Sequence, residues 1–88
     1  MIKQHILIAD SEPVVAYLLG EVLKRTDSNY LVSVVHSGEE ALEMLHDSSV
    51  DLLVADQYTS GISGLELIRW TQACSPQTST ILTTARQC

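Results

Sequence analysis

The segment "LLVADQYTSGISGLELI", residues 52–68, gives the strongest indication of the fold. It begins as an apolar run, stops at Asp56, passes through a loop that contains Gly61 and Gly64, and ends in a helical pattern. A short apolar run of this kind predicts a strand that is covered on both faces of a parallel sheet. Asp56 closes that strand and has no basic neighbour in the sequence, so any partner of its carboxylate must come from elsewhere.

Outside this stretch, short apolar runs alternate with helical patterns along the whole chain. The runs predict strands at "HILIA" (5–9), "YLVSVV" (30–35), "DLLVA" (51–55) and "STILTTA" (79–85). Helices are expected from Pro13, from a capping box of Ser37 and Glu40 to about Asp47, and from a capping box of Ser63 and Glu66 until Pro76. The alternation predicts an α/β fold, a doubly wound parallel sheet of βαβαβαβ order.

Each helical pattern carries apolar residues three and four positions apart. In the first helix these are Val14, Leu18 and Val22, with their neighbours Val15, Leu19 and Leu23. In the second helix Ala41, Leu42 and Leu45 are expected to point inward, and in the third Leu65 and Ile68 define the buried stripe, which leaves Trp70 near the outward side.

The composition indicates one small domain that does not bind nucleic acid or anionic membranes directly. The chain has 88 residues, 45% of them hydrophobic, and a formal net charge of −6, which fits one small domain over residues 1–88. The negative charge argues against direct binding of nucleic acid or an anionic membrane. Cys74 and Cys88 lack zinc-ligand spacing and are expected as reduced thiols of a cytoplasmic protein. The histidines, expected as ordinary surface residues, are His5, His36 and His46.

Oxygen-bearing side chains follow three of the predicted strands. Asp10 and Glu12 follow the first strand, Asp56 closes the third, and Thr83 and Thr84 end the fourth. Because carboxyl ends of parallel strands meet at one edge of the sheet, these groups are expected to lie together. Crowded carboxylates need a proton or a cation, and an all-oxygen set suits Mg²⁺ completed by a phosphoryl group. Each acid alone is typical of a loop or a helix entry; their joint position favours phosphate chemistry at Asp56.

Four ordered segments resemble the receiver domain of a bacterial two-component response regulator, the CheY-like family. They are "ILIADSEP" (6–13), "GEEAL" (38–42), "DLLVADQYTSGISGLELI" (51–68) and "ILTTA" (81–85). The resemblance implies a flavodoxin-like fold and a cytoplasmic signalling domain that is not a conventional enzyme, although it takes part in its own phosphorylation. The implied partner is a sensor histidine kinase or a phosphotransfer protein.

The resemblance also assigns roles to single residues. It implies that Asp56 is the phosphoacceptor and that Asp10, Asp56 and the main-chain carbonyl of Tyr58 hold Mg²⁺. It implies that Thr84 is the switch hydroxyl, which binds the phosphate. Ser11 and Glu12 would contribute weakly to the same pocket.

The chain departs from the family pattern at three places. Ser11 stands where the family has a second acid, so Mg²⁺ is expected to bind weakly, and Ser60 replaces a loop proline. The sequence stops at Cys88, so the domain is expected to be incomplete and to lack its last helix, strand and helix. A full receiver carries a lysine in that segment, whereas Lys3 and Lys24 both precede it. The fourth strand would then be an open sheet edge through which two copies could pair.

Three alternatives remain open at this point. The first is a receiver-like interaction or dimerisation module that works without phosphorylation, which Ser11 and the missing lysine favour. The second is a flavin or nucleotide site, although the acidic "ADSEP" (9–13) would repel phosphate. The third is an aspartate-nucleophile phosphohydrolase, a class that usually has an aspartate where this chain has Tyr58.

Overall fold

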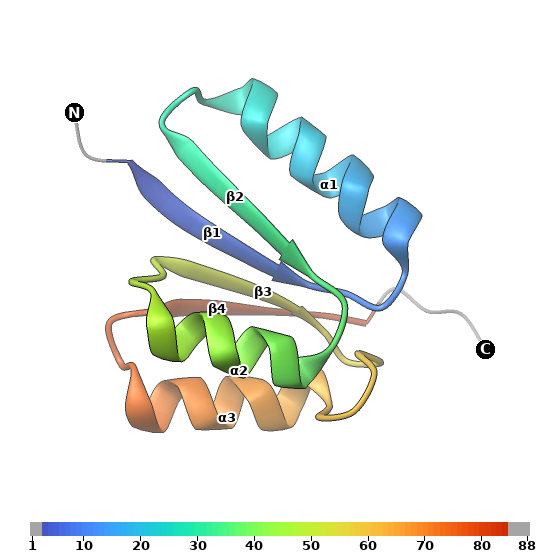
Figure 1. The fold of residues 1–88 in the computed structure, drawn as a ribbon, viewed down its shortest axis with the longest axis vertical. Helices are drawn as coiled ribbons and strands as arrows, with labels where there is room; N and C mark the ends of the chain where they lie inside the picture. Colours follow the sequence, from blue (N-terminus) through green and yellow to red (C-terminus); the bar gives the residue numbers. More distant parts are fainter. Residues whose placement is uncertain (1–2, 85–88) are drawn as a thin grey trace.

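The structure, a computed structural model, describes residues 3–84 and confirms the alternation of strands and helices. In chain order the elements are β1 (Gln4–Ala9), α1 (Pro13–Thr26), β2 (Tyr30–Val35), α2 (Gly38–Asp47), β3 (Leu52–Asp56), α3 (Gly64–Cys74) and β4 (Ser79–Thr83) (Figure 1). The fourth strand is shorter than expected, because it ends at Thr83; Ala85 and Cys88 lie outside the described residues.

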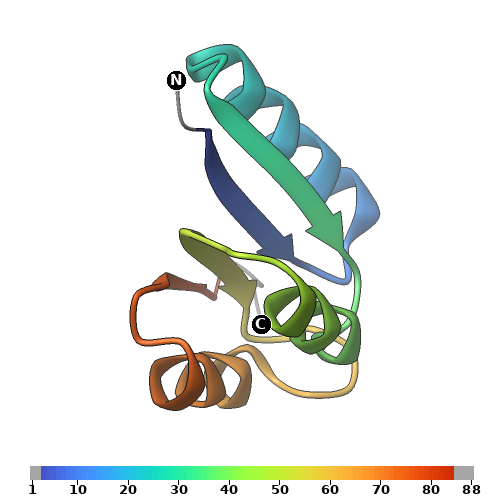
Figure 2. The same cartoon turned by 60° about the vertical axis from the view of Figure 1, so that its left-hand side comes forward.

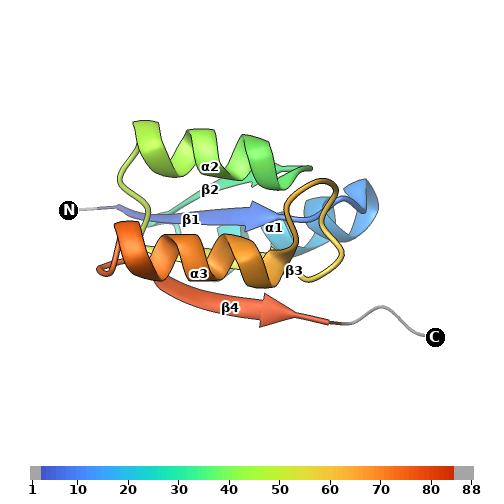
Figure 3. The same ribbon diagram turned by 90° about the horizontal axis from the view of Figure 1, so that it is seen from below.

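The strands form one parallel sheet of order β2-β1-β3-β4, as the predicted doubly wound fold requires. The chain winds outward from β1 to β2 and then crosses back to β3, so the winding reverses between β1 and β3. In folds of this kind, ligands bind beyond the carboxyl ends of the strands at that point of reversal. At the outer border of the sheet lies β4 (Figure 3).

Helices cover both faces of the sheet. One face carries α2 and α3 side by side, while α1 packs on the other against β1 and β2 (Figure 2). Two apolar clusters follow from this division. The cluster under α2 and α3 centres on Leu7, Leu53 and Leu67, each fully buried, and the cluster under α1 centres on Ile6 and Ile8.

The expected capping residues begin α2 and α3. Ser63 and Glu66 form the complete reciprocal box at α3. At α2, the Ser37 hydroxyl accepts a hydrogen bond from the Glu40 amide at 3.2 Å, but the Glu40 carboxylate accepts from the amide of His36 at 3.1 Å. The capping box predicted at α2 is therefore present in only one direction.

The buried face of α1 differs from the expected pattern. Its buried residues are Ala16 and Gly20, whereas Val14, Leu18 and Val22 are 70%, 56% and 60% exposed. Small residues let α1 lie close to the sheet, and of the expected apolar residues Leu19 and Leu23 pack, partly buried, against the cluster beneath the helix.

Two further expectations about burial are wrong. Leu65 in α3 is exposed, and Leu67 and Thr71 are buried there in its place. His5 is buried, because its imidazole links two segments: Nδ1–H donates to the Ser49 carbonyl at 3.0 Å, and Nε2 lies 2.8 Å from the Ser33 hydroxyl. Both ring nitrogens have polar partners, so burial leaves neither without a hydrogen bond.

Among the described residues, no helix combines the length and the hydrophobicity needed to cross a bilayer.

Candidate functional site

Asp10 and Asp56 stand at the carboxyl ends of the neighbouring strands β1 and β3. Both are buried, with exposed fractions of 8% and 7%. They line the same cavity of about 130 Å³, whose other walls are apolar except for Thr83. The fold therefore brings together the two carboxylates that sequence analysis singled out, at the point where the winding reverses.

The backbone on either side fixes the position of Asp10. Its amide donates to the Val35 carbonyl of β2 at 3.1 Å, which extends the pairing of β1 by one residue. Its carboxylate oxygen Oδ1 accepts from the amide of Glu12 at 2.8 Å, in the turn that leads into α1. Its own carbonyl accepts from Nδ1–H of His36 at 3.0 Å. The carboxylate is thus held by the turn that leads into α1.

Asp56 has a hydroxyl neighbour on β4. The register of the sheet pairs Asp56 with Thr83, and Thr83 Oγ1 donates to Asp56 Oδ1 at 3.5 Å, a long hydrogen bond. Within residues 3–84 a salt bridge joins Lys24 to Glu21, whereas none joins a described basic residue to Asp56. Two buried carboxylates beside one cavity repel each other, and a bound cation would relieve that repulsion.

The remaining predicted site residues lie at the rim. Thr84 directly follows β4 and is exposed, and the hydroxyl that reaches Asp56 belongs to its neighbour Thr83. Glu12 is exposed at the start of α1. The position of Thr83 at the end of a strand is predictable from the sequence, but its contact with Asp56 depends on the register between β3 and β4.

Ser11 and Tyr58 meet although they are far apart in the sequence. Ser11 Oγ donates to the main-chain carbonyl of Tyr58 at 3.2 Å, which joins the loop after β1 to the loop after β3. Ser11 is half-buried at this contact. The same carbonyl is the one that the resemblance assigns to the metal.

The donor chemistry of this edge suits Mg²⁺. It consists of two carboxylates and a main-chain carbonyl, all hard oxygen donors, and Mg²⁺ commonly binds proteins through one or two carboxylates while keeping several waters. Across residues 3–84, no three acidic, histidine or cysteine side chains gather as a metal site of their own. These residues fit a site that water and a phosphoryl group would complete.

One further polar residue of this edge was not predicted from the sequence. Thr59 is buried, and its hydroxyl donates to the carbonyls of Ala9 and Asp56. Nothing in the loop sequence singles out Thr59 from the hydroxyl residues near it. Its partners lie on two strands, so only the folded chain reveals the contact.

Two glycines shape the loop between β3 and α3. A Cβ atom at Gly64 would lie 2.5 Å from the carbonyl oxygen of Asp56, so α3 can begin against β3 only without a side chain there. Gly61 has a φ of +79°, a conformation that side chains disfavour. The two glycines thus allow the first residue of α3 to lie close to the main chain of Asp56.

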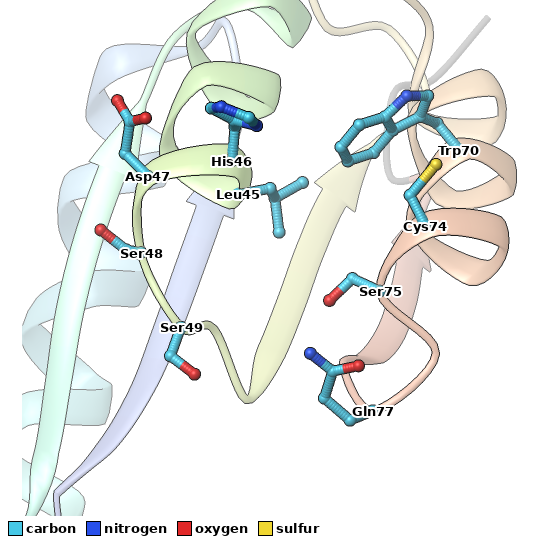
Figure 4. Close-up of a pocket in the computed structure, with 9 residues that line it drawn as sticks. All are labelled: Leu45, His46, Asp47, Ser48, Ser49, Trp70, Cys74, Ser75 and Gln77. Atoms are coloured by element: carbon cyan, nitrogen blue, oxygen red, sulfur yellow. The ribbon is translucent and has the colours of Figure 1, made fainter.

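A separate groove of about 440 Å³ lies at the opposite, amino-terminal end of β3 and β4. It runs between the last turns of α2 and α3, with Leu45 directed from α2 toward the side where Trp70 and Cys74 lie (Figure 4). Asp47 points away from its centre in the same view. The groove contains neither Asp10 nor Asp56. It is therefore distinct from the acidic edge, that is, the carboxyl ends of β1 and β3 with Asp10 and Asp56.

Comparisons with known proteins identify the family of the chain. The profile of the response regulator receiver domain matches residues 6–88. The transcriptional regulatory protein YkoG of Bacillus subtilis is 36% identical over 98% of this chain, which spans 37% of the length of that relative. The response regulator TrrA of Thermotoga maritima, crystallised with Mg²⁺ and BeF, is 33% identical, with a TM-score of 0.87 over 96% of this chain and 71% of its own.

TrrA has also been crystallised in complex with the histidine kinase ThkA, and that structure matches 97% of this chain and 72% of the other with 33% identity and a TM-score of 0.85. The chain therefore belongs to the response regulator receiver domain family. It is a CheY-like receiver domain of two-component signalling, a signalling module rather than a conventional enzyme.

Proposed function

We propose that this chain accepts a phosphoryl group on Asp56 from a histidine of a sensor kinase or a phosphotransfer protein, and relays the change to a partner. The observation that carries the proposal is the pair of buried carboxylates, Asp10 and Asp56, beside one cavity with no described basic partner. A receiver relative crystallised with Mg²⁺ and BeF supports it.

In the proposed step, a carboxylate oxygen of Asp56 attacks the phosphorus atom of phosphohistidine. A P–O bond forms while the P–N bond breaks, and the imidazole leaves with the electron pair of that bond. The hydroxyl of Thr84, at the end of β4, would donate to a phosphoryl oxygen and report the modification to the edge of the sheet.

Asp10, Asp56 and the carbonyl of Tyr58 would hold Mg²⁺. The ion would offset the negative charge of the carboxylates and of the phosphoryl oxygens when bound. Ser11 contributes a hydroxyl where a third carboxylate would be expected, and its hydrogen bond to Tyr58 must yield when that carbonyl takes up a metal. Both features support weak binding, and Glu12 at the rim adds negative charge nearby.

The proposed kinase contact lies beside the acidic edge. Helix α1 begins three residues after Asp10, and its exposed Val14 and Leu18 provide an apolar surface there, one turn apart. A kinase that delivers phosphohistidine to Asp56 must approach from this side. The complex of ThkA with TrrA supports a partner of this class, and the proposed location is the cytoplasm, where the exposed thiol of Cys74 stays reduced.

A second candidate is a module that binds partners without phosphorylation. The hydrogen bond from Ser11 to Tyr58 favours it, because the two loops are already joined without a metal ion. In this version the open edge at β4, with Ile81 and Leu82 exposed, pairs two copies of the chain.

Labelling with a radioactive small-molecule acyl phosphate in Mg²⁺ tests the first candidate. We expect acid-stable but base-labile label on the native chain, none on Asp56→Asn, and a native level on the control Asp47→Asn at the far end of the sheet. Beryllofluoride with Mg²⁺ should shift the amide resonances around Asp56. A folded native chain that takes up no label and shows no such shift would favour the second candidate.

A further inference from the structure

One buried hydroxyl connects the two strands that carry the acids. Thr59 is 5% exposed, and its Oγ1 donates to the Ala9 carbonyl at 3.3 Å and also to the carbonyl of Asp56. Ala9 is the last residue of β1 and precedes Asp10, while Asp56 is the last residue of β3. A single hydroxyl shared between two acceptors thus ties the loop to both strand ends.

The same residue shapes the turn that carries Tyr58. The Thr59 amide donates to the Asp56 carbonyl at 3.2 Å, so the backbone from 56 to 59 closes into a tight turn. On that turn the Tyr58 carbonyl faces Ser11, 3.2 Å from its Oγ. The hydroxyl of Thr59 therefore limits the rotation of the main chain that orients both the Asp56 carboxylate and the Tyr58 carbonyl.

We propose that Thr59 is a positioning residue of the phosphoacceptor site. Its hydroxyl does not touch the incoming group; it holds the strand ends and the turn in the geometry in which Asp56 reacts. The inference rests on the proposed phosphorylation of Asp56. A misplacement of reacting groups by about 1 Å can slow a reaction by up to about a hundredfold, so loss of this link should be visible in the rate.

Two variants at this position separate the hydroxyl from the space it fills. Thr59→Val keeps the shape and removes the donor, and we expect the rate of Asp56 labelling by the acyl phosphate to fall at least about tenfold. Thr59→Ser keeps the donor, and we expect a rate within about twofold of the native one. Folding of each variant is checked by circular dichroism before labelling.

Thr78 provides a matched control at the other end of the sheet. It is also 5% exposed, and its hydroxyl donates to the Val50 carbonyl at 2.7 Å. Thr78→Val removes a hydroxyl of the same kind and should lower the midpoint of thermal unfolding, yet leave the labelling rate unchanged. A folded Thr59→Val that is labelled at the native rate, or a Thr59→Ser that is as slow as Thr59→Val, overturns the proposal.

Hydrogen exchange of the Thr59 amide tests the positioning role of Thr59 without any phosphorylation of Asp56. In the native chain the Thr59 amide should be protected by its bond to Asp56, and Thr59→Val should increase its exchange rate at least about tenfold while Thr59→Ser does not. If the native chain takes up no label, the proposed function fails, and exchange alone then decides whether the hydroxyl holds the turn. Unchanged exchange in Thr59→Val would overturn the positioning role.

Discussion

At the acidic edge, the place of some residues in the fold could be predicted from the sequence, whereas the contacts of others could not. Asp10 and Asp56 could be predicted, because each follows a short apolar run, and the end of a strand fixes where its last side chains lie. The contacts of Ser11 with Tyr58 and of Thr59 with Ala9 could not, because these partners are 47 and 50 positions away in the sequence. His5 was misplaced for the same reason: its burial depends on hydrogen-bond partners in β2 and in the loop before β3.

At Ser11, a carboxylate should strengthen binding of the metal ion. In Ser11→Asp, the hydroxyl donor to the Tyr58 carbonyl is replaced by a negative group, and we expect Mg²⁺ affinity to rise at least about tenfold. Titration followed by amide resonances measures this without any phosphate. The control Ser28→Asp adds the same charge in an exposed turn and should leave the affinity unchanged; an equal rise there would show a general charge effect.

For the helices and strands, the residues at which they begin were more predictable than the side of each helix that is buried. The strand β2 and the starts of α1, α2 and α3 agree with the apolar runs and capping residues. The buried face of α1 was only partly predictable from its large apolar residues: Leu19 and Leu23 pack on the sheet as expected, but the residues that are buried are Ala16 and Gly20. Gly20 approaches Val32 and Val34 of β2, a contact that periodicity alone cannot distinguish from an exposed position.

Alanine at two glycines should have opposite effects on stability. At Gly64 the new Cβ would lie 2.5 Å from the Asp56 carbonyl, and we expect the free energy of unfolding to fall by about 1–3 kcal/mol. At Gly20 the atom nearest to the new Cβ would be 3.6 Å away, which is an ordinary contact. Because alanine forms helices better than glycine, Gly20→Ala should raise the free energy of unfolding by up to about 1 kcal/mol. Urea unfolding measures both, and a stabilised Gly64→Ala would contradict the close contact of α3 with β3.

Across the whole molecule, the two faces of the sheet are covered unequally. Two helices cover one face, and α1 packs on β1 and β2 of the other (Figure 2). Ile81 of β4 pairs in register with Val54, which belongs to the α1 cluster, so both side chains belong to that second face. Ile81 is 49% exposed, and with Val14, Leu18 and Val22 it leaves much apolar surface in solvent. The exposure of Ile81 fits the edge position expected for the fourth strand, whereas the exposure of Val14, Leu18 and Val22 depends on how α1 packs and was not visible in the local patterns.

This exposed surface should make the chain associate as its concentration rises. Ile81→Lys places a charge on the edge strand, and we expect self-association to weaken at least about tenfold, because an apolar side chain of this size contributes about 1.5–3 kcal/mol when buried. Sedimentation velocity over a range of concentrations measures it. Gln77→Lys adds the same charge in an exposed loop and should have no comparable effect. A native chain that stays monomeric throughout would refute pairing through β4.

The groove between α2 and α3 has an optical consequence. Trp70 is the only tryptophan of the chain and lies in that groove, partly shielded from solvent. Tryptophan fluorescence, excited selectively over the three tyrosines, therefore comes from one position on α3, the helix whose first residue, Gly64, lies against the main chain of Asp56. If phosphorylation or metal binding at the acidic edge moves α3 as a rigid body, the surroundings of Trp70 near the other end of the helix change. The tryptophan emission would then report the event without an added label.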